Sequence, residues 1–152
     1  MLTINEDDLT GDDTKSLLAL HLSGMHANSP PGHVFALDLS GLQSPGVTVW
    51  TARENGKTIG VAALKELGHG MGELKSMRTH PDFLRRGVAV ALLEHVIDQA
   101  RRRGLTRLSL ETGSGPTFDA ALTLYRKRGF QDGGAFADYE KSEFNQFLHL
   151  AL

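Results

Sequence analysis

Apolar residues in the middle of the chain recur at helical spacing. One stripe contains Val88, Leu92, Leu93, Val96, Ile97 and Ala100. Charged residues such as Glu94 and Asp98 fall off this stripe, which is typical of an amphipathic helix packed on a core. Gly104 follows three arginines, where the negative end of a helix dipole favours cations. The pattern predicts a helix that begins near Val88 and ends before Gly104.

Two stretches with alternating and β-branched residues precede this helix. They are Val47–Arg53 and Lys57–Leu67, separated by Glu54-Asn55-Gly56. An Asn-Gly pair between two such stretches is typical of a tight turn between antiparallel strands. We therefore expect an antiparallel hairpin here.

The segment Glu73–Thr79 links the hairpin to the helix and is expected to be the central strand. In a regular strand the apolar residues Leu74 and Met77 would point to opposite faces, because side chains alternate with a period of two. One extra residue in the strand would reconcile their positions. We therefore expect a β-bulge.

The remaining pattern completes an alternating order of strands and helices. We expect a strand at Leu2–Asn5, a helix carrying Leu17–Met25, a strand at Arg107–Glu111, a helix at Phe118–Arg128, and two strands within Phe130–Leu150, the second at Gln146–Leu150. Residues 28–46 contain two Pro-Gly stretches and predict a long loop that carries a short helix and covers a binding site. This order predicts an α/β (α+β) fold with a mixed sheet and helices on both faces.

Length and composition are those of an ordinary globular protein. The chain has 152 residues, of which 40% are hydrophobic and 22% charged, so we expect one domain over residues 1–152. It contains no cysteine, which excludes disulfides and thiolate catalysis, and its seven histidines show no metal-ligand spacing, so no metal is expected. The net charge of −2 argues against nucleic-acid binding. No stretch approaches about 18 apolar residues and the start lacks an apolar leader, which favours a cytoplasmic protein without a membrane partner.

Two arginines stand directly before the first turn of the central helix. The local sequence is Arg85-Arg86-Gly87-Val88-Ala89. The free N–H groups of a helix N-terminus already carry partial positive charge, so two further cations there suggest an anion in the turn. Gly87 and Ala89 are small enough to let a phosphate approach the backbone. A phosphate site is one interpretation of this segment, and a solvated basic loop is the other.

The segment resembles the coenzyme A pyrophosphate loop of the GCN5-related N-acetyltransferases (GNAT), which has the form (Q/R)-x-x-G-x-(G/A). Gly87-Val88-Ala89 matches the last three positions, whereas Leu84 stands where the family has Gln or Arg. Leu124–Phe130 resembles a second motif of the family, L-Y-x-x-x-G-F. Segments such as Gly72–Pro81 are most similar to small bacterial members of the family, some of which are named for acetylation of indoleacetate.

The resemblance covers nearly the whole chain and implies the acyl-CoA N-acyltransferase fold. In that fold a mixed, mostly antiparallel sheet of about seven strands is flanked by helices. Its bulged central strand is splayed from its parallel neighbour and leaves a slot for the pantetheine arm of the coenzyme.

The resemblance also implies a site for acetyl-CoA. The backbone of Met77, Arg78 and Thr79 would pair with the pantetheine amides, and a backbone N–H, that of Met77, would meet the oxyanion. Tyr125 would contact the coenzyme sulfur and act as the general acid. The pyrophosphate would bind the backbone N–H groups of Arg85, Arg86, Gly87, Val88, Ala89 and Val90, aided by the two arginine side chains.

Two carboxylates are candidates for the general base. A free alkylamine is mostly protonated near pH 7, so its attack on a thioester benefits from a base, either directly or through water. Glu73 begins the central strand, and Glu111 ends the neighbouring strand. The sequence leaves the choice between them open. We also expect Glu73, Glu111, Asp138 and Glu140 to line a pocket for a cationic acceptor.

The sequence thus predicts an acetyl-CoA-dependent N-acetyltransferase that acetylates an amine of a small acceptor by direct attack in a ternary complex. Two alternatives stay open. One is a CoA-binding sensor or partner-binding module without turnover. The other is a protein lysine or N-terminal acetyltransferase, which would need an open groove. The aromatic C-terminal strands could also form the edge of a homodimer.

Overall fold

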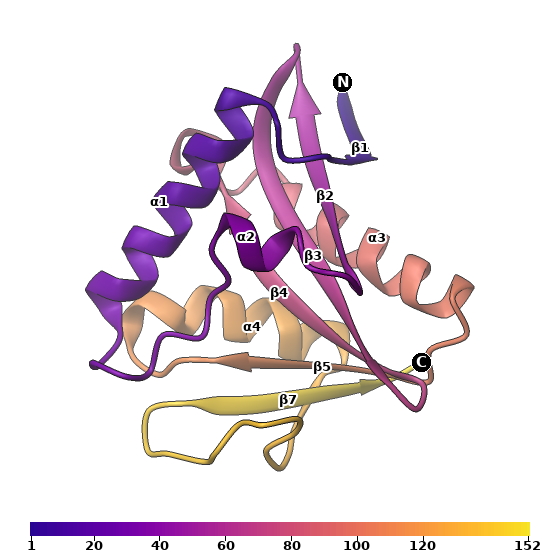
Figure 1. Cartoon of the computed structure of the whole chain (residues 1–152). Helices are drawn as coiled ribbons and strands as arrows, with labels where there is room; N and C mark the ends of the chain where they lie inside the picture. The colour runs from indigo at the N-terminus through magenta and orange to yellow at the C-terminus, as the bar shows by residue number, and fades with distance from the viewer.

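A sheet of seven strands runs through the molecule (Figure 1). The computed structural model describes residues 1–152. The strands are β1 (Leu2–Glu6), β2 (Val47–Glu54), β3 (Lys57–Gly68), β4 (Met71–Thr79), β5 (Arg107–Thr112), β6 (Gln131–Asp132) and β7 (Gln146–Ala151). They lie in the order β1-β2-β3-β4-β5-β7-β6, and only β4 and β5 are parallel. The expected mixed, mostly antiparallel sheet is confirmed.

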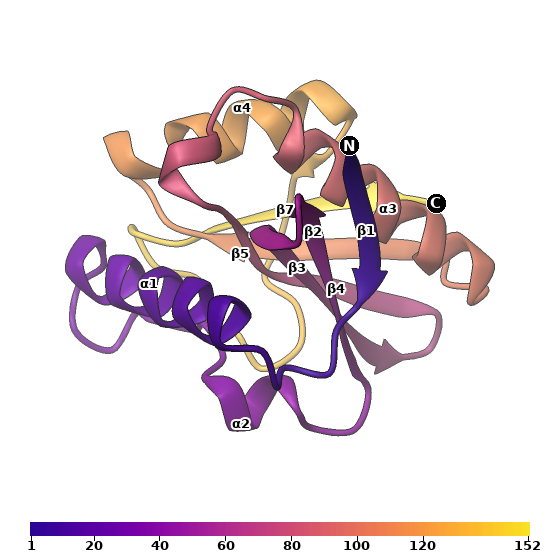
Figure 2. The same cartoon turned by 90° about the horizontal axis from the view of Figure 1, so that it is seen from above.

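Helices cover both faces of the sheet. They are α1 (Asp12–Asn28), α2 (Leu39–Leu42), α3 (Val88–Arg102) and α4 (Asp119–Arg128). Figure 2 shows α1 and α2 on one side of the sheet and α3 and α4 on the other. The short helix expected within residues 28–46 is present as α2. The expected arrangement, with helices on both faces of the sheet, is confirmed.

The larger of two apolar cores lies between the sheet and α3 and α4. It contains the whole predicted stripe of α3, whose six residues are at most 3% exposed. A Cβ on Gly60 of β3 would lie 2.7 Å from Val88 Cγ1, so the first turn of α3 packs directly on the sheet backbone. The smaller core joins α1 and α2 to β2 and β3 through residues such as Leu17 and Leu42. Close packing at Gly60 thereby fixes the position of the turn before α3.

The predicted bulge interrupts β4. Val61 of β3 pairs with Arg78, and Ala63 pairs with Lys75, so two residues of β4, Ser76 and Met77, stand opposite one residue of β3. Ser76 has a φ of 54°. The extra residue bends the strand and increases its local twist.

Strands β4 and β5 separate soon after they begin. They pair only at Met71–Glu73 and Arg107–Ser109, and beyond these residues the two strands diverge (Figure 1). The expected splay between the bulged strand and its parallel neighbour is thus confirmed. Backbone groups of β4 beyond Glu73 are left without a partner from β5.

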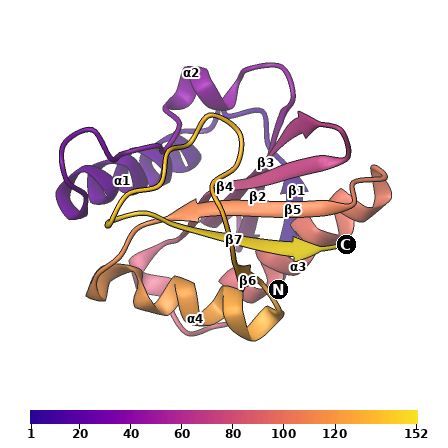
Figure 3. The same cartoon turned by 90° about the horizontal axis from the view of Figure 1, so that it is seen from below.

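The two strands expected within Phe130–Leu150 are present as β6 and β7, and the second begins at Gln146 as predicted. β6 has only two residues, however, and residues 133–145 form an irregular loop between the two strands. Aromatic residues in this loop pack edge-on against other rings, as Phe136 does on Phe147 and Tyr139 on Phe35. Figure 3 shows the loop crossing to the face that α1 and α2 cover.

Candidate active site

Two adjoining cavities open where β4 and β5 diverge. The inner cavity, of about 150 Å³, lies between α1, β4 and β5 and includes Glu73 and Glu111. The outer cavity, of about 570 Å³, lies between the end of β4, the turn before α3 and α4. The two share the residues Met77, Arg78, Thr117, Ala121 and Tyr125.

The outer cavity gathers nearly all of the residues expected to hold the coenzyme. It is lined by Met77, Arg78, Thr79, Arg85, Gly87, Val88, Ala89, Val90 and Tyr125. Arg86 is the exception, because its guanidinium lies 3.5 Å from Glu54 Oε1 and 5.2 Å from the centre of the Phe83 ring. Arg85 and Arg86 therefore differ: only Arg85 lines the cavity.

The turn before α3 has the geometry of an anion cradle. Arg85 and Gly87 have φ values of 63° and 81°, and no side chain caps the first N–H groups of α3. A Cβ on Gly87 would have no neighbour within 4 Å, so space is open above the turn. Alternating left-handed residues at a helix N-terminus turn successive N–H groups toward one point, which suits a phosphate. The residues present therefore fit the pyrophosphate of the coenzyme.

A partly buried hydrogen-bonded triangle adjoins the inner cavity, which two of its members, Glu73 and Lys75, line. Tyr139 Oη donates to Glu73 Oε2 at 2.5 Å, and Lys75 Nζ donates to the same oxygen at 3.2 Å and to Tyr139 Oη at 2.8 Å. The side chains of Glu73 and Lys75 are only 3% and 8% exposed. Burial, together with the charge of Glu73, raises the pKa of Tyr139, so its hydroxyl stays a donor. Glu73 is thus committed to two partners.

Glu111 is the less committed carboxylate of the inner cavity. It takes part in none of the ion pairs of the structure. Burial raises the pKa of its carboxyl to about 7, and the charge of Glu73 adds to this, while Lys75 opposes it. A carboxyl group that titrates near neutrality can take up a proton from an amine at physiological pH.

Tyr125 stands at the junction of the two cavities. Its side chain comes from α4, it is 6% exposed, and its ring packs 5.7 Å from that of Phe130. Burial raises the pKa of the Tyr125 hydroxyl, which keeps it protonated at neutral pH. A protonated hydroxyl between the cavities can donate a hydrogen bond or a proton to a group bound there.

The expected acidic pocket is only partly formed. Glu73 and Glu111 line the inner cavity, but Asp138 and Glu140 are exposed on the irregular loop and do not. Lys75 also lies beside Glu73 and offsets its charge. The expectation of four carboxylates around a cationic acceptor was therefore wrong, because residues 138–140 are not on a strand that faces the cavity.

Three side chains were missed as site residues by the sequence analysis. His21 was given no role there, yet it lines the inner cavity from α1. Arg78 was expected to act only through its backbone, and Tyr139 was given no role. The loop over residues 28–46, by contrast, does border the inner cavity, through Phe35 and Ala36.

Comparisons with known proteins agree with this geometry. The sequence model of the Acetyltransferase (GNAT) family matches residues 15–130. The chain is 48% identical to YedL of Escherichia coli, an uncharacterized N-acetyltransferase, over 100% of the chain and 96% of that protein. It is 36% identical to an IAA acetyltransferase of Azospirillum brasilense over 76% of the chain and 75% of that protein.

Solved structures share the fold. A protein of Klebsiella pneumoniae, provisionally named an acyl-CoA N-acyltransferase, superposes with a TM-score of 0.85 at 28% identity, covering 100% of this chain and 98% of its own. An acetyltransferase of Bacillus subtilis in complex with CoA has the same fold, with a TM-score of 0.74 at 19% identity and coverage of 100% and 99%. The chain belongs to the GNAT acetyltransferase family.

None of the helices has the length and apolar character needed to cross a bilayer. No group of three or more His, Asp or Glu side chains is placed to hold a metal ion.

Proposed function

We propose that the chain is an acetyl-CoA-dependent N-acetyltransferase that acetylates a small amine by direct attack in a ternary complex. One observation carries the proposal. A carboxyl group with a pKa near 7, Glu111, and a buried protonated tyrosine, Tyr125, share a cavity that adjoins an anion cradle at a helix N-terminus.

The outer cavity would hold the coenzyme. The N–H groups of residues 85–90 would bind the pyrophosphate, with Arg85 adding charge. The backbone of Met77–Thr79, left without a partner from β5, would pair with the pantetheine amides. Acetyl-CoA supplies the acetyl thioester that reacts at the junction of the two cavities.

Glu111 is the base that the geometry favours. It would take a proton from the attacking amine, whose nitrogen bonds to the acetyl carbon and leaves a negative charge on the acetyl oxygen. The carbon–sulfur bond breaks when this tetrahedral intermediate collapses. Glu73, the other candidate, already accepts hydrogen bonds from Lys75 and Tyr139, so its role would be to hold these residues in place. A base within reach of the amine contributes about 10²–10⁴-fold to the rate of such a step.

The reaction also needs a proton for the leaving sulfur and a donor for the oxyanion, and Tyr125 and the bulged strand would provide them. Tyr125 would give its proton to the sulfur that leaves, and the N–H of Met77 would stabilise the negative oxygen that forms on the acetyl carbon. The bulge favours this second role, because it gives Ser76 and Met77 a register different from that of a regular strand.

The size of the inner cavity favours a small acceptor. Its volume of about 150 Å³ lies well below the roughly 300–1,000 Å³ of sites for drug-sized ligands. Phe35 and Ala36 of the loop at residues 28–46 border this cavity, whereas a protein substrate would need an open groove.

Calorimetric titration with acetyl-CoA and CoA tests the coenzyme site. Gly87→Asp and Gly87→Asn form a matched pair, because both residues tolerate a positive φ and they differ mainly in charge. We expect micromolar binding to the wild type and to Gly87→Asn, and at least tenfold weaker binding to Gly87→Asp. Absence of binding to the wild type, or equal binding to both variants, would contradict the proposed binding of the coenzyme pyrophosphate at this turn.

Turnover separates an enzyme from a sensor. We expect the acetylated amine and free CoA thiol to form in equal amounts from acetyl-CoA and an accepted amine. Binding of acetyl-CoA without any such product would favour a silent CoA-binding module instead.

A further inference from the structure

A guanidinium group without an ionic partner stands between the two cavities. Arg78, at the end of β4, is partly buried and takes part in none of the ion pairs of the structure. Its two Nη atoms lie 3.3 and 3.4 Å from the place of a Cβ on Gly24. Gly24 belongs to α1 and lines only the inner cavity, so the guanidinium lies on the acceptor side of the junction.

His21 adds an unpaired polar atom to the same place. It stands one turn before Gly24 on α1, lines the inner cavity and is 8% exposed. Its Nδ1 is buried without a hydrogen-bond partner. Burial and the charge of Arg78 lower the pKa of His21 to about 4, so the imidazole is neutral at pH 7 and can still donate one hydrogen bond.

The other charges around the inner cavity are already paired, except one. Lys75 and Glu73 compensate each other at 3.2 Å, and Tyr139 binds both. Glu111 remains as the acidic group and Arg78 as the basic group. The cavity therefore offers one unpaired site of each sign, with a neutral histidine beside the basic one.

We propose that the acceptor is an amine that also carries a carboxylate, such as a free amino acid, with its carboxylate bound by Arg78 and His21. Its amine would then face Glu111. This inference rests on the proposed acetyltransferase activity. A planar guanidinium binds a carboxylate through two parallel hydrogen bonds, whereas a purely cationic acceptor would leave Arg78 without compensation. The volume of about 150 Å³ suits a small molecule of this class.

Paired acceptors test the carboxylate directly. Phenylalanine is compared with phenethylamine, alanine with ethylamine and lysine with cadaverine, and the remaining amino acids are screened alone. We expect the wild type to have the higher kcat/KM for the amino acid of at least one pair. In Arg78→Met the kcat/KM for that amino acid should fall by about 10- to 100-fold, mainly through KM, and the preference over the amine should disappear.

Two further variants control this experiment. Arg78→Lys keeps the charge but loses the planar fork, so we expect an intermediate loss. Arg102→Met removes an arginine that is exposed and paired with Asp98 on the outer side of α3, and it should behave as the wild type. Affinity for CoA should change by less than about threefold in Arg78→Met, because Arg78 would contact the coenzyme through its backbone.

Several outcomes would overturn the inference. A wild-type preference for the amines without a carboxylate would contradict it. An equal fall in kcat/KM for both acceptors of a pair in Arg78→Met would also contradict it. Neither result would contradict the proposed acetyltransferase activity. Loss of CoA binding in that variant would assign Arg78 to the coenzyme instead. If no amine is acetylated, the thermal stability of the CoA complex with and without amino acids tests the carboxylate site. Stabilisation of the wild type that is lost in Arg78→Met supports the site. Absence of stabilisation in the wild type refutes it.

Discussion

Tyr139 and Glu73, 66 residues apart in sequence, are joined by a hydrogen bond of 2.5 Å from the tyrosine hydroxyl to Oε2 of the carboxylate. The bond ties the irregular loop before β7 to the point on β4 where β4 and β5 separate. Lys75 Nζ donates a second hydrogen bond to the same oxygen at 3.2 Å. Because Glu73 is held by both, the two carboxylates of the inner cavity have different environments, and each should respond differently to mutation.

Glu73→Gln should mainly lower stability. The variant leaves the buried ammonium of Lys75 without its counter-charge, and breaking a buried ion pair on one side costs about 3 kcal/mol of unfolding free energy. Urea unfolding at pH 7.5 measures this. Glu66→Gln is the control, since the Glu66 pair with Arg103 is exposed and should cost less than about 1 kcal/mol. A Glu73→Gln variant of wild-type stability that has lost turnover would make Glu73 the base.

Glu111 should set the acidic limb of the pH–rate profile. Its carboxyl, with a pKa of about 7, must be ionised to accept a proton, so kcat/KM should fall about tenfold per pH unit well below pH 7 and level off above it. Glu111→Gln should lower kcat by about 10²–10³-fold and remove this limb. Steady-state rates between pH 5.5 and pH 9 at saturating acetyl-CoA measure both effects. A limb that persists in Glu111→Gln would come from another group.

The same carboxyl should make stability depend on pH. Its folded pKa of about 7 exceeds the unfolded value of 4.5, so the folded state binds the proton more tightly. Proton binding to Glu111 therefore stabilises the folded state. This stabilisation is complete below pH 4.5 and is lost as the pH rises through 7. Glu111→Gln should therefore match the wild type near pH 4.5 and be more stable by about 1–3 kcal/mol at pH 8. Paired urea titrations at the two pH values test this, and a variant less stable at pH 8 would contradict it.

Tyr125→Phe should slow the reaction without weakening the fold. The Tyr125 hydroxyl makes no hydrogen bond within the chain, and the ring contact with Phe130 is kept in the variant, so the unfolding free energy should change by less than about 1 kcal/mol. If the hydroxyl is the general acid, kcat should fall by about 10²-fold or more while the Kd of CoA stays within about threefold. Tyr139→Phe is the matched control, because it removes the bond to Glu73 and should act chiefly on stability. Normal turnover in Tyr125→Phe would leave this tyrosine a purely structural role.

Local sequence patterns were enough for most of the fold. The apolar stripe of α3 and the Asn-Gly turn of the β2–β3 hairpin are encoded by neighbouring residues. The spacing of Leu74 and Met77, which does not fit a regular strand, was enough to predict the bulge. Each of these features depends on contacts or dihedral preferences that act over a few positions. The turn before α3 likewise lies within one short segment, so its residues could be grouped from the sequence, and they do line one cavity. That they bind the coenzyme stays a prediction.

The inner cavity depends on contacts between distant segments and was predicted less well. The aromatic residues of the loop before β7 suggested a strand, but they pack on rings from other parts of the chain, such as Phe35. The positions of Tyr139, Asp138 and Glu140 follow from that packing. Arg78 and His21 line the same cavity because α1 packs beside β4, and no pattern within either segment indicates this.

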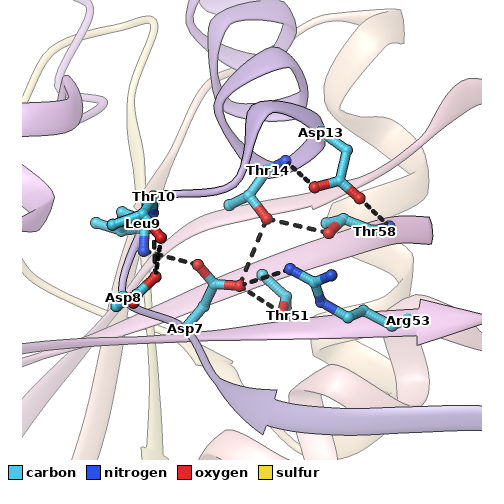
Figure 4. Close-up of polar contacts among 9 residues, drawn as sticks. All are labelled: Asp7, Asp8, Leu9, Thr10, Asp13, Thr14, Thr51, Arg53 and Thr58. Atoms are coloured by element: carbon cyan, nitrogen blue, oxygen red, sulfur yellow. Dashed lines mark hydrogen bonds and ion pairs between the residues drawn. The ribbon is translucent and has the colours of Figure 1, made fainter. Parts of the chain in front are cut away.

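Two carboxylates hold the start of α1 to the sheet: Asp13 accepts a hydrogen bond from the backbone N–H of Thr58 on β3 at 2.8 Å, and Asp7 binds residues of β2. Asp7 Oδ2 accepts hydrogen bonds from Thr51 at 3.0 Å, Arg53 at 3.2 Å and Thr14 at 3.4 Å (Figure 4). Its Oδ1 accepts one from the backbone N–H of Leu9 at 2.7 Å, and Leu9 has a φ of 67°. Asp7 thus joins β2 to the turn and first residues of the helix that carries His21 and Gly24.

Asp7→Ala should therefore act on both stability and acceptor binding. It leaves the hydroxyls of Thr14 and Thr51, which are at most 1% exposed, with fewer partners, and should lower the unfolding free energy by about 2–3 kcal/mol. Because α1 contributes to the inner cavity and not to the outer one, the KM for the acceptor should rise while the Kd of CoA stays within about threefold. Asp12→Ala, at an exposed position of the same turn, should change stability by no more than about 0.5 kcal/mol. Equal weakening of coenzyme and acceptor binding in Asp7→Ala would mean that α1 supports the whole site rather than the inner cavity alone.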